Sequence, residues 1–201
     1  ILPLDADIEM SQPFFFDDQN DLIFRSFYKW QDEESFEVRR LGFETIFSRQ
    51  LSGVNNFFIS ARIERDSVRV KDRDAMQNLD DLYNKSVLTA GFNRNSTNQL
   101  FTPSDGIIVK LRAEESGALL ESRFQYYKFS ADIRHYEDIG NDQVLALRLF
   151  SGLMKPYGNS DITPIEERFF AGGAYSVRGW ERQTLGPQAI AMWRYAFALP
   201  L

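Results

Sequence analysis

The chain contains no cysteine and only one histidine among its 201 residues. Zinc sites and Cys–His nucleophiles are built from these two residue types, so both kinds of site are nearly excluded. The single histidine, His135, stands beside Tyr136 at the end of an expected strand, and we expect no catalytic role for it. The lack of cysteine is compatible with an exported bacterial protein.

Long apolar runs and an excess of basic charge are also missing. No run approaches the roughly 18 apolar residues that a transmembrane helix requires. The net charge of −6 argues against nucleic acid as a partner, because phosphate binding needs clustered basic residues.

Patterns for covalent chemistry or cofactor binding are absent as well. Glu114 and Glu115 are adjacent in an expected strand and therefore point apart, which is the wrong geometry for paired acid–base catalysis. The stretch 105–110 (DGIIVK) lacks the Gly-Lys-Ser/Thr pattern of a phosphate loop. Residues 72–81 are acidic, but their spacing does not match a calcium loop, and we interpret them as a solvated extracellular loop. We expect no enzyme activity, no metal and no cofactor.

An initiator methionine and a signal-peptide pattern are not found at the start, ILPLDADIEM, which is typical of the middle of a protein. We therefore expect residues 1–201 to be a mature piece or a fragment. Since no internal repeat, low-complexity tract or linker interrupts it, we expect it to form part of one domain.

Aromatic residues and period-two alternation are what the sequence has in abundance. Aromatics reach 14%, with 18 Phe, which is more than soluble cores usually contain and is typical of membrane β-barrels. In about nine segments, apolar side chains alternate with polar or charged ones, as in half-buried strands. The expected apolar faces are Leu41, Phe43 and Phe47; Phe57, Ile59, Ala61 and Ile63; Ile107, Val109, Leu111 and Ala113; Tyr127, Phe129, Ala131 and Ile133; Leu145, Leu147 and Leu149; and Trp193, Tyr195, Phe197 and Leu199.

Two folds are compatible with this alternation, namely a soluble antiparallel sheet and a membrane barrel that is apolar outside and polar inside. The strands are long, and their polar faces bear charges of both signs, as a wet lumen allows. Some connections are short (51–56 and 138–142), whereas others are long and polar (71–84 and 155–167). These features favour an all-β, antiparallel transmembrane barrel. Because closed barrels of this class usually have an even number of strands, we expect further strands outside this chain.

Two stretches narrow the choice of family. The stretch 168–180, RFFAGGAYSVRGW, is followed by LGP at 185–187, and it resembles the signature loop of the Omp85 superfamily of outer-membrane barrels, whose members include BamA and TamA. The stretch 86–106 resembles the family's strand–turn–strand with a Phe-x-Pro-x-x-Gly turn, here Phe101, Pro103 and Gly106. The residues that match the loop motif are Phe170, Gly172, Gly173, Val177, Arg178, Gly179 and Trp180.

The resemblance implies a barrel of about sixteen strands, of which this chain contains a part, in the bacterial outer membrane. It implies assembly, insertion or translocation of other proteins, without enzyme chemistry. The expected partners are outer-membrane lipid, unfolded client outer-membrane proteins and accessory lipoproteins or a periplasmic partner. Periplasmic POTRA domains precede the barrel in the family and are not found in this chain.

The resemblance also implies that the loop folds into the lumen, where its arginine contacts acidic residues of the wall. Glycines 172, 173 and 179 would permit close approach to that wall, and Arg178 would form a charge-assisted contact. Three alternatives stay open: the pore of a two-partner secretion system, the membrane anchor of a fused enzyme, and a soluble β-sandwich binding module.

Overall fold

The computed structural model describes residues 4–33, 36–71, 81–141, 143–169 and 196–198, and most of them form one antiparallel sheet. The first eight strands are 10 to 17 residues long, so each is long enough to cross a bilayer in a tilted orientation. The strands are β1 (Leu4–Pro13), β2 (Asn20–Asp32), β3 (Phe36–Ser52), β4 (Asn55–Val70), β5 (Asp81–Asn95), β6 (Gly106–Ser116), β7 (Tyr126–Gly140), β8 (Gln143–Pro156) and β9 (Ala196–Ala198).

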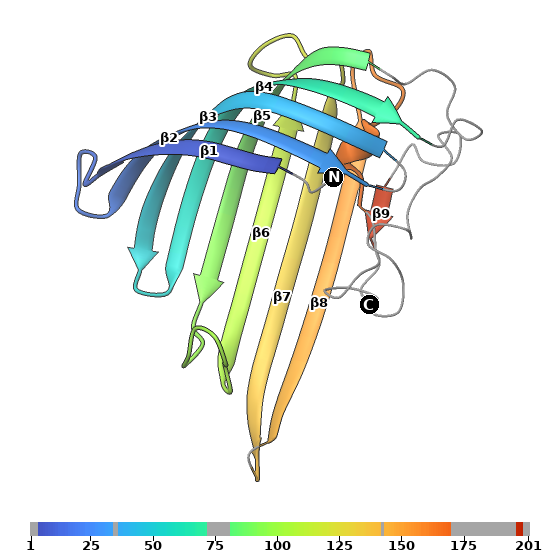
Figure 1. Ribbon diagram of the computed structural model, residues 1–201. Helices are drawn as coiled ribbons and strands as arrows, with labels where there is room; N and C mark the ends of the chain where they lie inside the picture. Colours follow the sequence, from blue (N-terminus) through green and yellow to red (C-terminus); the bar gives the residue numbers. More distant parts are fainter. Residues whose placement is uncertain (1–3, 34–35, 72–80, 142, 170–195, 199–201) are drawn as a thin grey trace.

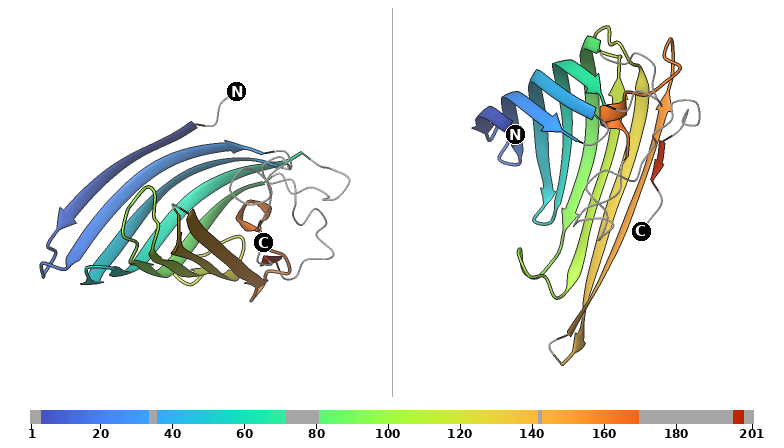
Figure 2. Two further views of the ribbon diagram at one scale, coloured as in Figure 1. Left: turned by 90° about the horizontal axis from the view of Figure 1, so that it is seen from below. Right: turned by 45° about the vertical axis from the view of Figure 1, so that its right-hand side comes forward.

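Each strand pairs with the next one along the chain, which gives the order β1 to β9 without a crossover. Figures 1 and 2 show that the sheet curls into a trough. One 3-10 turn of the described chain, η1 (Ile165–Glu167), lies on the concave side of this trough. The prediction of an all-β antiparallel architecture with about nine strands is confirmed. No helix in the described part of the chain has the length and apolarity needed to cross a membrane.

The two faces of the sheet differ as the alternation predicts. On the convex face, Leu111, Phe129 and Leu147 keep 43%, 50% and 55% of their surface exposed, and Ile133 is half-buried. The concave face instead presents charged side chains, among them Arg62 and Glu64 of β4, which flank the outward-facing Ile63. An apolar exterior and a charged interior are the arrangement of a barrel wall between lipid and a polar lumen.

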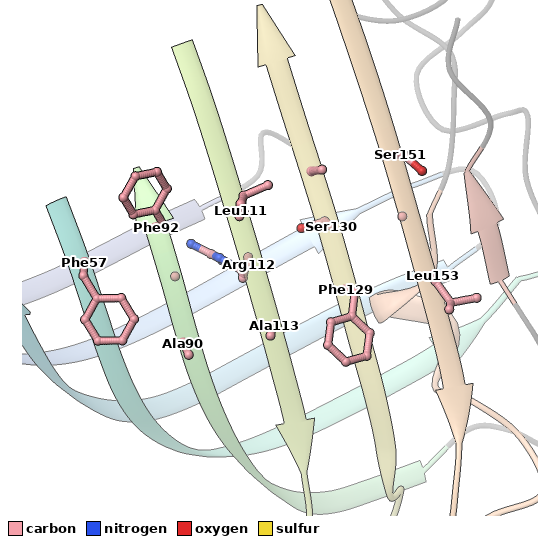
Figure 3. A pocket seen from close by; sticks show the side chains of 13 residues that line it. Phe57, Ala90, Phe92, Leu111, Arg112, Ala113, Phe129, Ser130, Ser151 and Leu153 are labelled. Carbon is pink, nitrogen blue, oxygen red and sulfur yellow. The ribbon is translucent and has the colours of Figure 1, made fainter. Parts of the chain in front are cut away.

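A shallow groove of about 450 Å³ dents the convex face between β4 and β8. Figure 3 shows that the small side chains Ala90 and Ala113 form its floor, with Phe57, Phe92 and Phe129 around them. Its lining is mainly apolar, and it opens on the convex face.

The connections separate into two ends of the sheet. Strands β1 and β2, β3 and β4, β5 and β6, and β7 and β8 are joined at one end. Strands β2 and β3, β4 and β5, and β6 and β7 are joined at the other, the long-loop end, where β8 also ends. The predicted split into a short-turn end and a long-loop end therefore holds, apart from the ten-residue 96–105 and the three-residue 33–35. Of the expected loop 72–81, residues 72–80 lie outside the described residues, and Asp81 already belongs to β5.

A small apolar core lies on the concave side at the long-loop end. It joins side chains of five strands and of the β6–β7 connection to Ile165 of η1, with Ile162 and Phe169 packed against it. The described members of this core are Phe36, Val38, Val68, Val70, Tyr83, Phe124, Tyr126, Met154 and Ile165. The trough is thus filled at this end by the chain that follows β8.

Candidate functional site

The segment that follows β8, residues 157–169, is named the arm here, and it folds back over the concave face. At its start, the Tyr157 N–H donates to the carbonyl of Gln125 (3.0 Å). The Gln125 N–H donates to the hydroxyl of Ser160 (2.8 Å). Further along, Thr163, Ile165 and Glu167 are buried. The sequence prediction of a long polar loop at 155–167 is therefore wrong in part, since β8 continues to Pro156 and the arm is packed into the trough.

Apolar contacts explain part of this docking. The far end of the Phe169 ring lies against Gly152 of β8, where an added Cβ would lie only 2.4 Å from its Cζ atom. Burying a side chain the size of Ile165 stabilises a structure by about 1.5–3 kcal/mol. Beneath the arm, the space next to Tyr83 and Phe124 is about 10 Å³, so the packing there leaves room for little more than one water molecule.

Lys85 of β5 is the centre of a buried group of charges under the arm. Its ammonium nitrogen lies 2.7 Å from Glu64, 2.8 Å from Asp66 and 2.8 Å from Glu167. Glu166 is farther away, at 3.7 Å. The Lys85 side chain has no exposed surface. A buried ammonium needs partners of this kind, because an unpaired charge is strongly disfavoured in a poorly solvated site.

Glu167 is the arm's main contact with this group, since basic side chains of three strands surround it. Besides Lys85, its carboxylate lies 2.9 Å from Lys128 Nζ of β7 and 3.4 Å from Arg40 Nη1 of β3. Arg40 also donates to the backbone carbonyl of Glu166 (3.3 Å). One carboxylate of the arm thus ties together β3, β5 and β7.

The basic side chains around Glu167 and the burial of the arm shift the pKa values of Glu167 and Arg168. Burial opposes ionisation of Glu167, but Lys85, Lys128 and Arg40 outweigh it and hold the pKa of this carboxyl well below its ordinary value. Next to it, burial lowers the pKa of Arg168, whose guanidinium donates to the Thr163 hydroxyl (3.0 Å) and carbonyl (2.6 Å). Tyr83 Oη donates to the carboxylate of Glu166. Glu167 is therefore held as a carboxylate, and hydrogen bonds hold the residues on either side of it.

The sequence-predicted turn residues lie at the opposite end of the sheet, between β5 and β6. Gly106 has φ +114°, and a Cβ there would lie 2.5 Å from the carbonyl oxygen of Ser96, so the turn requires glycine. Asn98 closes the turn by accepting from the N–H groups of Ser104 (3.1 Å) and Asp105 (3.2 Å). Of the other two motif residues, Pro103 is half-buried and Phe101 is exposed.

The loop-motif residues Phe170, Gly172, Gly173, Val177, Arg178, Gly179 and Trp180 lie outside the described residues. Their proposed roles stay predictions. The described arm ends at Phe169, directly before Phe170, so the chain enters the motif from the concave side of the sheet.

Sequence reasoning missed the charged group itself. Arg40, Lys85, Lys128 and Glu167 stand in four different segments, and each is unremarkable alone on a polar strand face or in a polar loop. One signal was present, namely the Glu-Glu pair at 166 and 167 immediately before the loop motif. Only the strand register places three basic side chains opposite it.

Comparisons with known proteins agree with this geometry. Residues 4–197 match the family model of the Omp85 superfamily domain. The chain is 34% identical over 100 residues to the outer membrane protein assembly factor BamA of Neisseria meningitidis, covering 50% of this chain and 12% of that protein. It is 29% identical over 105 residues to the sorting and assembly machinery component 50 homolog of Xenopus tropicalis, covering 52% of this chain and 22% of that protein.

A solved structure shows the same fold. The crystal structure of BamA from Haemophilus ducreyi lacking POTRA domains 1–3 superposes with a TM-score of 0.76 at 18% identity, covering 92% of this chain and 39% of that one. The chain thus spans well under half the length of the proteins it matches.

Proposed function

The chain belongs to the Omp85 superfamily, and from this premise we propose that it is part of the barrel of a factor that assembles or inserts proteins in the outer membrane. Its similarity to BamA and to the sorting and assembly machinery component supports this choice among the family's activities. The clients are unfolded outer-membrane proteins, and the convex apolar face lies against lipid.

The observation that carries the proposal is the buried arm. Glu167 holds the chain on the concave side just before the motif loop, through Lys85, Lys128 and Arg40. In our proposal the arm is the fixed base of a loop that works inside the lumen. A fixed base limits the positions that the rest of the loop can reach, in the same way that packed supporting residues position a binding group.

The test uses the full-length protein in its own host. Its production is switched off, and the amounts of several folded outer-membrane barrels are measured by their heat-modifiable migration. A fall in many unrelated barrels supports an assembly factor. Loss of one secreted protein, with all barrels at their normal level, would instead identify a dedicated secretion pore and overturn the proposal. Normal barrels together with loss of an attached enzyme activity at the membrane would identify an anchor, and would overturn it equally.

A second experiment tests the role of residues 157–169 as the base of the loop. Glu167→Gln removes the charge while it keeps the size of the side chain, and Glu121→Gln changes an exposed acid in the β6–β7 connection as a matched control. We expect slower barrel assembly in the first variant and a normal rate in the second. Equal rates in both variants would remove the arm from the proposed mechanism.

A further inference from the structure

Three arginines gather on the convex face where β3 and β4 reach the long-loop end. Ser67 of β4 pairs with Arg39 of β3, and Arg65 and Arg69 stand two positions on either side of Ser67 along β4. Side chains at such direct and diagonal positions are about 5–8 Å apart on one face of a sheet. All four side chains are exposed. The chain as a whole is acidic, so this cluster is a local exception.

Two acidic side chains on this part of the convex face, Glu37 and Asp32, already have basic partners, and Glu37 stands directly opposite Arg69 in the strand register. Glu37 accepts from Arg39 (2.9 Å) and from the indole N–H of Trp30 (3.0 Å), so its carboxylate is already engaged. Asp32 pairs with Lys71. Within the described residues, neither Arg65 nor Arg69 has an acidic partner within salt-bridge distance.

The position of the cluster relative to the apolar surface is the second observation. Arg65 pairs directly with Leu41, which is 62% exposed, and the exposed Ile63 and Phe43 follow immediately toward the middle of the sheet. The ring of Trp30 lies beside Arg39, with the guanidinium carbon 5.5 Å from its centroid. Tryptophan marks the water interface of membrane proteins. The guanidinium groups therefore stand one step beyond the acyl-facing surface, at the depth of lipid headgroups.

We propose that Arg39, Arg65, Arg69 and Ser67 bind the phosphate of a membrane lipid headgroup in the leaflet at the long-loop end. Guanidinium groups bind phosphate oxygens with two parallel hydrogen bonds, and a serine hydroxyl adds a further donor. The exposed apolar side chains directly below give the acyl chains of the same lipid a surface to lie on. A lipid satisfies both parts of this surface, whereas a soluble phosphate satisfies only the first. The inference depends on the membrane location of the chain and not on its assembly activity.

The experiment uses the full-length protein reconstituted into phosphatidylcholine vesicles that contain spin-labelled phosphatidic acid or spin-labelled phosphatidylcholine. The fraction of motionally restricted label gives the relative affinity of the protein surface for each lipid. The test variant is Arg65→Gln with Arg69→Gln. The matched control is Arg49→Gln with Arg94→Gln, which removes two arginines near the other end of β3 and β5.

We expect the wild-type protein to prefer phosphatidic acid by about fivefold or more, since one basic side chain near an anionic membrane surface is worth about that factor. The preference should fall close to onefold in the test variant and persist in the control. Arg65→Lys with Arg69→Lys keeps the charge and should retain part of the preference. No preference in the wild type, or an equal loss in test and control variants, would overturn the proposal.

Discussion

The ammonium of Lys85 lies 2.8 Å from the carboxylate of Glu167, although 82 residues separate them in the chain. Lys85 belongs to the sheet wall and Glu167 to the arm, so this contact fixes the chain that leaves β8 against the concave face. The pair is buried together with Glu64 and Asp66, so the loss of either partner changes the balance of charge in a poorly solvated site.

Removal of the negative charge of Glu167 should release the arm from the concave face. Glu167→Gln removes the arm carboxylate that lies closest to Lys85 and Lys128. Because Lys85 keeps Glu64 and Asp66, we expect a cost below the roughly 3–5 kcal/mol of a buried charge that is left without a partner. We expect faster backbone hydrogen exchange across residues 157–169 in the full-length protein in detergent micelles. Exchange in the middle of β4 and β5 should stay slow. Glu121→Gln is the control, and an exchange pattern in Glu167→Gln that matches it would show that the arm does not depend on this residue.

The low pKa of Glu167 predicts how arm docking responds to acid. A carboxyl whose pKa is depressed in the folded state stabilises that state above its unfolded pKa of about 4.3, and this contribution is lost as the pH falls through the lower folded value. The contribution of Glu167 should therefore be constant from about pH 8 to pH 5. A fluorophore attached through Asn159→Cys reports arm docking, and the shift of its signal between wild type and Glu167→Gln should not change in this range. A shift that shrinks as the pH falls from 7 to 5 would contradict the assignment.

The turn between β5 and β6 depends on one glycine. Gly106→Ala places a Cβ 2.5 Å from the Ser96 carbonyl oxygen at φ +114°, a conformation that costs a non-glycine residue about 1–3 kcal/mol before any clash is counted. Urea unfolding of the refolded protein should show a loss of at least this size. Gly53→Ala is the matched turn control, because its added Cβ would meet no atom within 4 Å. Equal midpoints for the two variants would mean that the turn tolerates a side chain.

A charged side chain near the middle of the convex face should destabilise the folded protein in a membrane. Leu111, Phe129, Ile133 and Leu147 face outward, and arginine in place of any of them near the middle of the membrane should cost about 2–4 kcal/mol. The measurement is the folded fraction after refolding into lipid vesicles. Ser130→Arg, on the concave face beside Phe129, is the control that adds the same charge toward the lumen. If all four outward variants fold as well as this control, the assignment of the lipid face is wrong.

Sequence alone predicted the faces of the strands but not the charged group. The alternation is strict over residues 59–64 of β4 and 109–114 of β6, where one side meets lipid and the other meets the lumen, so a one-residue shift in register would reverse both faces. Nothing of this kind constrains the arm. Its polar composition is typical of a solvated loop, and its burial depends on contacts with Lys85, Lys128 and Arg40, each of which comes from a different strand. Apart from the Glu-Glu pair at 166 and 167, long-range pairings of this kind leave no signal in the local sequence.

The signature loop predicts a role for Arg178 inside the lumen, and the docked arm places the start of that loop on the concave side. This arginine lies outside the described residues, in a glycine-rich stretch that begins directly after the arm, and we expect it to form an ion pair with a carboxylate of the lumen wall. Arg178→Ala should therefore loosen the loop beyond the arm and reduce barrel assembly, while the strands stay paired. The loss of a buried partner costs about 3–5 kcal/mol, whereas an exposed arginine contributes less than about 1 kcal/mol. Arg178→Lys should rescue poorly, because an ammonium cannot reproduce the planar guanidinium fork.

The arm and the arginine can be tested separately, because they hold the loop at different points. Hydrogen exchange at 157–169 reports the arm, and protease cleavage beyond residue 170 in intact cells reports the rest of the loop. We expect Arg178→Ala to increase cleavage while arm exchange stays slow, and Glu167→Gln to change both, since the base of the loop is then free. If Arg178→Ala leaves cleavage and barrel assembly at wild-type levels, this residue does not hold the loop, and the glycines around it must serve another contact.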